Sequence, residues 1–362
     1  MCTIAGYAGN KQAAPILIEM IKKQEYFDGG LSTGIATIHN GKVYTAKVLG
    51  DSEELLRSTD AINLPGTVGI IHSRTGNNHI THAHPFTSDD EELALVLNGT
   101  LRFTGTEEML AHERQVMNEL SDRGIKIKSA IEPTDENYPL YLKNGMMFHD
   151  TEPFALIIGD KVSKVDNEHL REELVKATKE TLEDFPQDII TVSVHARLDD
   201  TITIGTLNRP MAVGFGDGET FIASCPIAFP DDIQKNPVTF LPPTSVSQVT
   251  SEGLHIYTTK MEGVKVEEVD YRKAGIVYKR MEEQLKGQKD NPKSIYDMSL
   301  MEGIWKEPYI DCRYSKGEGF FKPICILLYE ALYNFHKEGR LHSTLGLMKD
   351  NKTKITKFWI ED

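Results

Sequence analysis

Short runs of branched aliphatic residues alternate with polar turns through residues 1–285, a pattern typical of antiparallel sheet. Two such runs within 34–48 flank Asn40 and Gly41, which readily take the positive φ of a tight hairpin turn. A second hairpin is expected where residues 211–215 and 219–224 flank a glycine-rich turn. Further strands are expected at 68–72, 93–97, 154–158, 189–194 and 201–206.

Apolar residues recur at helical spacing in three other segments. Residues 13–24 place Ile16, Met20 and Ile21 on one face, and a further helix is expected at 167–182. The third helix is expected at 106–123, with Thr106 as its N-cap. Together with the strands, these helices predict an α+β fold.

Composition excludes several classes of protein. The 362 residues carry 40 basic and 54 acidic side chains, a net charge of -14, which argues against general nucleic-acid or anionic-membrane binding. No apolar run reaches the length of a membrane span, and no secretory signal is visible, so a cytoplasmic protein is expected. The cysteines are too sparse for a disulfide framework and lack metal-ligand spacing; they are Cys2, Cys225, Cys312 and Cys325.

A polar segment at 286–293 predicts a boundary between a domain of residues 1–285 and a small module of residues 286–362. The module combines a helical run at 321–335, an apolar run at 341–347 and a strand-like run at 355–360. This pattern favours a mostly helical or winged-helix-like appendage. With 13 basic and 11 acidic residues it is barely positive, so packing or dimerisation is favoured over nucleic-acid binding.

Cys2 is the first candidate for chemistry. If Met1 is removed, the Cys2 thiol stands beside a free α-amine, which can take the thiol proton and later deliver it to a leaving amine. The alternative is that Cys2 is only a small buried hydrophobic residue.

Two polar motifs follow predicted strands. His72-Ser73-Arg74 delivers a guanidinium that can grip a carboxylate, although an arginine after a strand is more often a solvated charge. Asn98-Gly99 offers two donors for an oxyanion, or an ordinary hairpin turn. Three nearby histidines, His79, His82 and His84, lack a matched acid or thiol set, so no metal is expected.

These motifs, taken in order, resemble class II glutamine amidotransferases, which are N-terminal-nucleophile hydrolases, and most closely the glutaminase domain of glucosamine-6-phosphate synthase. The resemblance covers residues 1 to about 270. It rests on MC-x-I-x-GY-x-G at 1–9, GG-x-S-x-GIA at 29–36, H-x-R at 72–74, AHP at 83–85, NG at 98–99, TDE at 134–136 and the hairpin at 208–224.

The resemblance implies a four-layer αββα sandwich with a small C-terminal, mostly helical appendage, and hydrolysis of L-glutamine to glutamate and ammonia through a thioester on Cys2, without a cofactor. Asn98 and Gly99 would form the oxyanion hole. The implied substrate-binding residues are Arg74 for the α-carboxylate, Asp135 for the α-ammonium, and His72 and Thr75 beside Arg74. Asp135 could equally cap a short helix that starts at Glu136.

The sequence departs from the family at Leu97 and Thr75, around the expected glutamine pocket. The 77 residues after Leu285 are too few for a sugar isomerase domain, so ammonia is expected to pass to a separate synthase subunit, and a homodimer is possible. Two alternatives stay open. The protein could be a stand-alone amidase for γ-glutamyl or other amides, or a catalytically silent glutamine-binding regulatory module.

Overall fold

The computed structural model describes residues 2–76, 79–99, 106–135, 137–264, 274–306, 324–348, 350 and 352–361. Predictions that concern Met1, Cys312, Glu136 and the first residues of the helix at 321–335 lie outside this part of the chain. In the described part, no helix is both long and apolar enough to cross a lipid bilayer.

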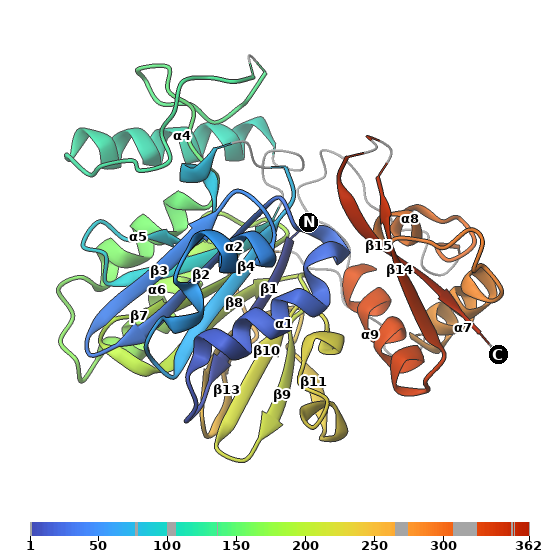
Figure 1. Ribbon diagram of the computed structural model, residues 1–362. Helices are drawn as coiled ribbons and strands as arrows, with labels where there is room; N and C mark the ends of the chain where they lie inside the picture. The colour runs from blue at the N-terminus through green and yellow to red at the C-terminus, as the bar shows by residue number, and fades with distance from the viewer. Residues whose placement is uncertain are drawn as a thin grey trace.

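Two antiparallel sheets lie face to face at the centre of the molecule (Figure 1). The first contains β1 (Cys2–Ala8), β2 (Ser32–His39), β3 (Lys42–Val48), β4 (Val68–Arg74), β9 (Ala212–Gly216), β10 (Glu219–Ala223) and β11 (Val238–Phe240). Their order is β11-β9-β10-β1-β4-β2-β3. The second contains β5 (Phe86–Thr87), β6 (Leu93–Gly99), β7 (Ile189–His195), β8 (Leu198–Leu207), β12 (Thr244–Thr250) and β13 (Gly253–Thr258). Their order is β13-β12-β8-β7-β6-β5.

Helices cover the outer face of each sheet. The first sheet is covered by α1 (Ala13–Asp28) and α2 (Ser52–Ser58), with short 3-10 turns at η1 (Ala61–Asn63), η3 (Pro226–Ala228) and η4 (Ile233–Lys235) nearby. The second is covered by α5 (Glu152–Val162) and α6 (Leu170–Asp184), and α4 (Glu107–Asp122) packs outside α5. The expected four-layer αββα sandwich is therefore confirmed.

Strand alternation separates the cores of these layers. In β1, Ile4 points between the two sheets, whereas Ala5 and Tyr7 point toward α1. The central strands are buried on both faces, which explains why they appear in the sequence as nearly continuous apolar runs.

Most local predictions are confirmed. Asn40 and Gly41 have φ angles of 49° and 70° and join β2 to β3. The Thr106 hydroxyl accepts from the amide of Met109 and caps α4, as expected. Helix α1 continues beyond the predicted end to Asp28, and α6 starts later than expected, at Leu170.

The strand predicted at 154–158 is wrong. These residues lie in α5, where Pro153 occupies the first turn and Phe154, Leu156 and Ile158 are buried. Because α5 packs against both the second sheet and α4, its apolar residues face several directions. Such a helix shows no amphipathic period, and its short apolar run cannot be distinguished from a buried strand by pattern alone.

The C-terminal region contains α7 (Ala274–Leu285), α8 (Ile295–Leu300), α9 (Ile324–Lys337) and a hairpin of β14 (Leu341–Leu347) and β15 (Lys354–Ile360). Its core includes Trp305, Leu328 and Phe358, together with Phe27 from α1. The segment at 286–293 is bridged at both ends to β15, and α7 contributes to the same core. The domain boundary at 285 stays a prediction.

Candidate active site

Cys2 and Asn98 join the two sheets at one end. Cys2 begins β1 and Asn98 lies near the end of β6. The Asn98 amide group donates to the Cys2 carbonyl at 2.8 Å, and its side-chain oxygen accepts from the Cys2 nitrogen at 3.2 Å. Because Asn98 is buried, these bonds hold the backbone of Cys2 firmly against β6.

Gly99 ends β6 beside Ile189 in β7. A Cβ atom at Gly99 would lie 2.3 Å from Cγ2 of Ile189 and 2.9 Å from Cδ2 of Leu97. Asn98 and Gly99 therefore continue the strand instead of forming a hairpin turn, and the close approach of β7 alone requires glycine here.

Arg74 lies directly opposite Cys2 in the pairing of β1 with β4. Its Nη1 donates to the carbonyl of His82 at 2.9 Å and contacts Nε2 of His149. The preceding residue, Ser73, accepts at Oγ from the Gly30 amide at 2.9 Å. The guanidinium is thus held between β4 and two other segments, on the same end of the sheets as Cys2.

His72 and Thr75 flank this strand end differently. The His72 ring is fully buried, and its centroid is 3.8 Å from that of His84. Burial, followed by the nearby Arg74 charge, lowers the pKa of His72 to about 3, so the ring is neutral. Thr75 is half-buried immediately after β4. The His72 ring presents no surface to solvent.

Asp135 lies apart from these residues. Its side chain is exposed, and its Oδ1 accepts from the Asn137 amide at 2.9 Å. Residues 137–151 form turns and isolated bridges but no helix, so the capping alternative has no support in this described stretch. Within the described residues, no hydrogen bond or ion pair joins Asp135 to Cys2, Arg74 or Asn98.

Opposing effects set the pKa of the Cys2 thiol. Burial is the largest and raises the pKa above its usual value, while Arg74 and Arg209 lower it. Asp28, at the end of α1, raises it further. A half-buried thiol with a raised pKa requires an adjacent base to become a nucleophile.

Arg209 forms a buried ion pair with Asp188, with 2.8 Å between Nη2 and Oδ2. Asp188 precedes β7 and Arg209 follows β8, so both lie at the end of the second sheet where Gly99 lies. Burial raises the pKa of the Asp188 carboxyl, and Arg209 opposes this shift. The sequence motif at 208–211 pointed to Arg209 only as part of a hairpin.

The nearby histidines form a packed cluster. Among the described residues, no group of three or more histidine, cysteine or acidic side chains is arranged to hold a metal ion. His82 and His84 instead pack edge-on against His149, each with 5.4 Å between ring centroids. His79 bonds to Thr81 within its own turn, η2 (Ile80–His82). Sequence reasoning missed His149, because no local pattern connects it to residues some 70 positions earlier.

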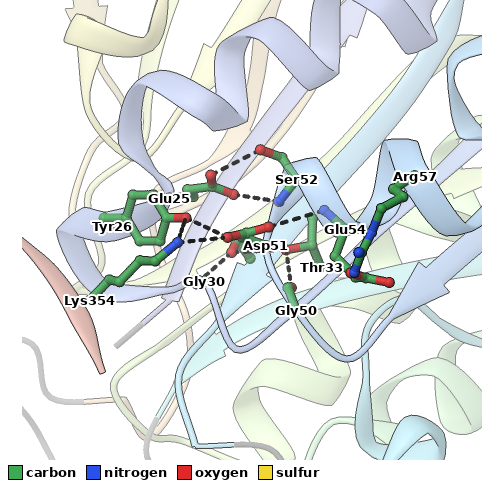
Figure 2. Close-up of polar contacts among 11 residues, drawn as sticks. Glu25, Tyr26, Gly30, Thr33, Gly50, Asp51, Ser52, Glu54, Arg57 and Lys354 are labelled. Carbon is green, nitrogen blue, oxygen red and sulfur yellow. Dashed lines mark hydrogen bonds and ion pairs between the residues drawn. The ribbon is translucent and has the colours of Figure 1, made fainter. Parts of the chain in front are cut away.

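The C-terminal hairpin contacts α1 and the residue that caps α2 (Figure 2). Lys354 of β15 lies 3.3 Å from Oδ2 of Asp51 and 3.2 Å from the Tyr26 hydroxyl, which donates to the same carboxylate at 2.5 Å. Next to this group, the buried Glu25 carboxylate accepts from the backbone amide and the hydroxyl of Ser52. The end of α1 is therefore fixed both to α2 and to the C-terminal region.

Comparison with known proteins adds sequence relatives and a shared fold. No protein-family model matches the chain. Glutamine–fructose-6-phosphate aminotransferase of Chlorobaculum tepidum is 30% identical over 284 residues, which cover 75% of this chain and 40% of the relative. The enzyme of that name from Pyrococcus horikoshii is 28% identical over 227 residues, 62% of this chain and 32% of the relative. The chain thus spans about a third to two fifths of these relatives.

Among solved structures, glutamine phosphoribosylpyrophosphate amidotransferase from B. subtilis superposes with a TM-score of 0.53 at 17% identity. The aligned region covers 78% of this chain and 58% of that one. At this level of identity the likeness concerns the fold alone.

Proposed function

Because the first three quarters of this chain is homologous to glutamine–fructose-6-phosphate aminotransferases and has the N-terminal-nucleophile fold of class II glutamine amidotransferases, we propose that it hydrolyses L-glutamine to glutamate and ammonia. The observation that carries the proposal is the meeting of Cys2, Arg74 and Asn98 at one end of the two sheets. A nucleophile, a carboxylate-binding cation and an amide donor are the groups that glutamine hydrolysis needs.

In the proposed reaction, removal of Met1 frees the α-amine of Cys2, which takes the thiol proton. The sulfur attacks the γ-amide carbon of glutamine, and the resulting oxyanion accepts hydrogen bonds from Asn98 and Gly99. The α-ammonium returns its proton to the amide nitrogen as the carbon–nitrogen bond breaks, so that ammonia leaves. Water then hydrolyses the thioester, which releases glutamate and restores the Cys2 thiol. The raised pKa of the Cys2 thiol supports the need for this neighbouring base.

Arg74 is proposed to bind the α-carboxylate, with His72 and Thr75 beside it, and Asp135 to bind the α-ammonium. The fixed guanidinium of Arg74 supports the first assignment. Asp135 reaches the substrate in this proposal only if its exposed loop moves toward Arg74 when glutamine binds.

Intact-mass spectrometry of the purified protein, before and after treatment with a diazo-ketone analogue of glutamine, tests the proposal. The expected result is loss of Met1 and one adduct, absent from Cys2→Ala. Retained Met1 without an adduct would contradict catalysis and favour a glutamine-binding module. Faster hydrolysis of larger γ-glutamyl amides than of glutamine would favour the amidase.

We further propose that the ammonia serves a separate synthase subunit. The support is that the matched relatives are aminotransferases more than twice as long as the region they share with this chain. Native purification followed by mass spectrometry is expected to recover such a subunit and to report whether residues 286–362 form a homodimer. Rapid glutaminase activity of the isolated chain, with no co-purifying protein, would contradict the separate subunit.

A further inference from the structure

His149 occupies a fixed position beside Arg74. Its side chain is only 3% exposed, and its ring stacks on Phe86 with 4.9 Å between centroids and an angle of 26° between the planes. The rings of His82 and His84 pack against it edge-on. Packing on these sides leaves the imidazole little rotational freedom, so the direction of its ring nitrogens is set by the fold.

The contact with Arg74 favours one tautomer of His149. A guanidinium only donates hydrogen bonds, so Nε2 of His149 must present its lone pair to Nη1 of Arg74. In the neutral ring the proton then resides on Nδ1, which lies 3.1 Å from Oδ1 of Asp150. The Thr151 amide donates to Nδ1 at 3.1 Å in the alternative tautomer, so in the tautomer that accepts from Arg74 the Nδ1 proton goes to Asp150 and Thr151 gives up this hydrogen bond.

The same contact determines which edge of the guanidinium remains for a ligand. Within the described parts of the chain, the hydrogen-bonding contacts of Arg74 use Nη1, with His149 and the His82 carbonyl as acceptors. Nη2 and Nε lie on the other edges of the planar group. An arginine held at one nitrogen presents its remaining donors in a defined direction, which suits two-point binding of a carboxylate.

We propose that His149 is a positioning residue for a substrate carboxylate: it accepts a hydrogen bond from Arg74 and so orients the guanidinium that binds the ligand. The inference rests on the proposed function, in which that carboxylate is the α-carboxylate of glutamine. His149 itself does not touch the substrate. His149 fixes the guanidinium before the ligand arrives, so Arg74 does not lose orientational freedom on each binding event.

Two substitutions separate hydrogen bonding from packing. His149→Phe keeps an aromatic ring against Phe86 but removes the acceptor, whereas His149→Gln places an amide oxygen near the position of Nε2. Arg74 is proposed to contact the carboxylate equally in the ground and transition states, so the effect falls on KM. For His149→Phe we expect KM for glutamine to rise by about tenfold with kcat within about twofold, the size typical of losing one charge-assisted hydrogen bond. His149→Gln is expected to restore most of the affinity.

His195→Gln is the matched control, because His195 is equally buried but lies at the opposite end of β7, away from Arg74. It is expected to leave KM unchanged. Calorimetric titration of glutamine into Cys2→Ala, with and without His149→Phe, measures binding without turnover and should show the same loss of affinity.

The outcomes distinguish the two proposals. Wild-type KM and affinity in His149→Phe would overturn the positioning role while leaving glutamine hydrolysis intact. A fall in kcat alone, or an equal defect in His149→Gln, would also overturn it, because neither follows from orienting Arg74. Failure of the unmodified chain both to bind and to hydrolyse glutamine would instead overturn the proposed function, and this inference with it.

Discussion

At the scale of single residues, polar groups buried beside the sheets are held by specific partners. Glu25 is 2% exposed, and its two carboxylate oxygens accept from the amide and hydroxyl of Ser52 at 2.8 and 2.9 Å (Figure 2). These bonds favour the charged form, yet burial outweighs them and raises the pKa of Glu25 to about 7. The folded protein therefore binds a proton at this site more tightly than the unfolded chain does.

This raised pKa predicts a pH dependence of stability. The unfolded carboxyl titrates near its ordinary pKa of 4.5. The stabilising contribution of protonated Glu25 is fully present below that pH and is lost as the pH rises through about 7. In the Glu25→Gln variant, the free energy of unfolding should fall by about 1–3 kcal/mol less between pH 5 and 8 than it does in the unmodified protein. Urea unfolding across that range measures the change.

Glu53→Gln serves as the control for Glu25→Gln. Glu53 is acidic and lies in the same helix as Ser52, but its side chain is exposed. It should retain most of the pH dependence of the unmodified protein, because the Glu53 charge makes only a minor contribution to the raised pKa of Glu25. Parallel unfolding curves for Glu25→Gln and the unmodified protein at every pH would show that burial does not perturb Glu25.

At the scale of elements, the pairing of β6 with β7 depends on the absence of a side chain at Gly99. Gly99→Ala places a Cβ atom 2.3 Å from Cγ2 of Ile189. Ile189 is buried and cannot move without disturbing the hydrophobic core between the second sheet and its helices. We expect a loss of about 1–3 kcal/mol in the free energy of unfolding, the usual cost of overpacking. Because Ile189→Ala removes the clashing atom, the double variant should lose less than the sum of the single losses.

Gly275→Ala provides a matched comparison. Gly275 lies in α7, and among the described residues no heavy atom outside its own stretch of helix lies within 4 Å of the position its Cβ would take. This substitution should stabilise the protein by about 0.5–1 kcal/mol through helix propensity alone. Additive losses for Gly99→Ala and Ile189→Ala would contradict a direct clash.

The sequence predicts elements where a local signal exists. Asn40-Gly41 marked a hairpin, and Thr106 marked the start of α4, because turn and cap chemistry depends on adjacent residues. The strand prediction for residues 154–158 is wrong, because a helix buried on several sides loses its amphipathic period. His149 and Asp188 carried no local signal. Their positions beside Arg74 and Arg209 follow from packing between segments far apart in the chain.

At the scale of the whole molecule, the C-terminal region shares a core with the sandwich. Phe27, near the end of α1, packs edge-on against Phe358 of β15 with 5.1 Å between ring centroids. Both rings are buried, and they belong to one cluster with Trp305. Shared burial of this kind couples the unfolding of two regions.

Phe358→Ala should therefore destabilise the sandwich as well as the hairpin. We expect a loss of about 3–5 kcal/mol, typical of a large buried aromatic side chain, in a single cooperative transition. Lys354→Met should cost less than about 1 kcal/mol, because its ion pair with Asp51 is partly exposed. Differential scanning calorimetry distinguishes a single cooperative transition from independent unfolding of the two regions. Two separated transitions, with the upper one unchanged in Phe358→Ala, would show that the regions unfold independently.

The position of β1 determines when the first strand becomes enclosed in its sheet. This first strand lies inside its sheet, between β4 and β10, and residues 5–8 pair with residues 220–223. At ribosomal rates of about 5–20 residues per second, roughly 10–40 s separate the synthesis of the two partners. During that interval the start of the chain lacks one of its neighbours and is open to an aminopeptidase. The proposed removal of Met1 is therefore expected on the nascent chain, before the last strands of the first sheet are made.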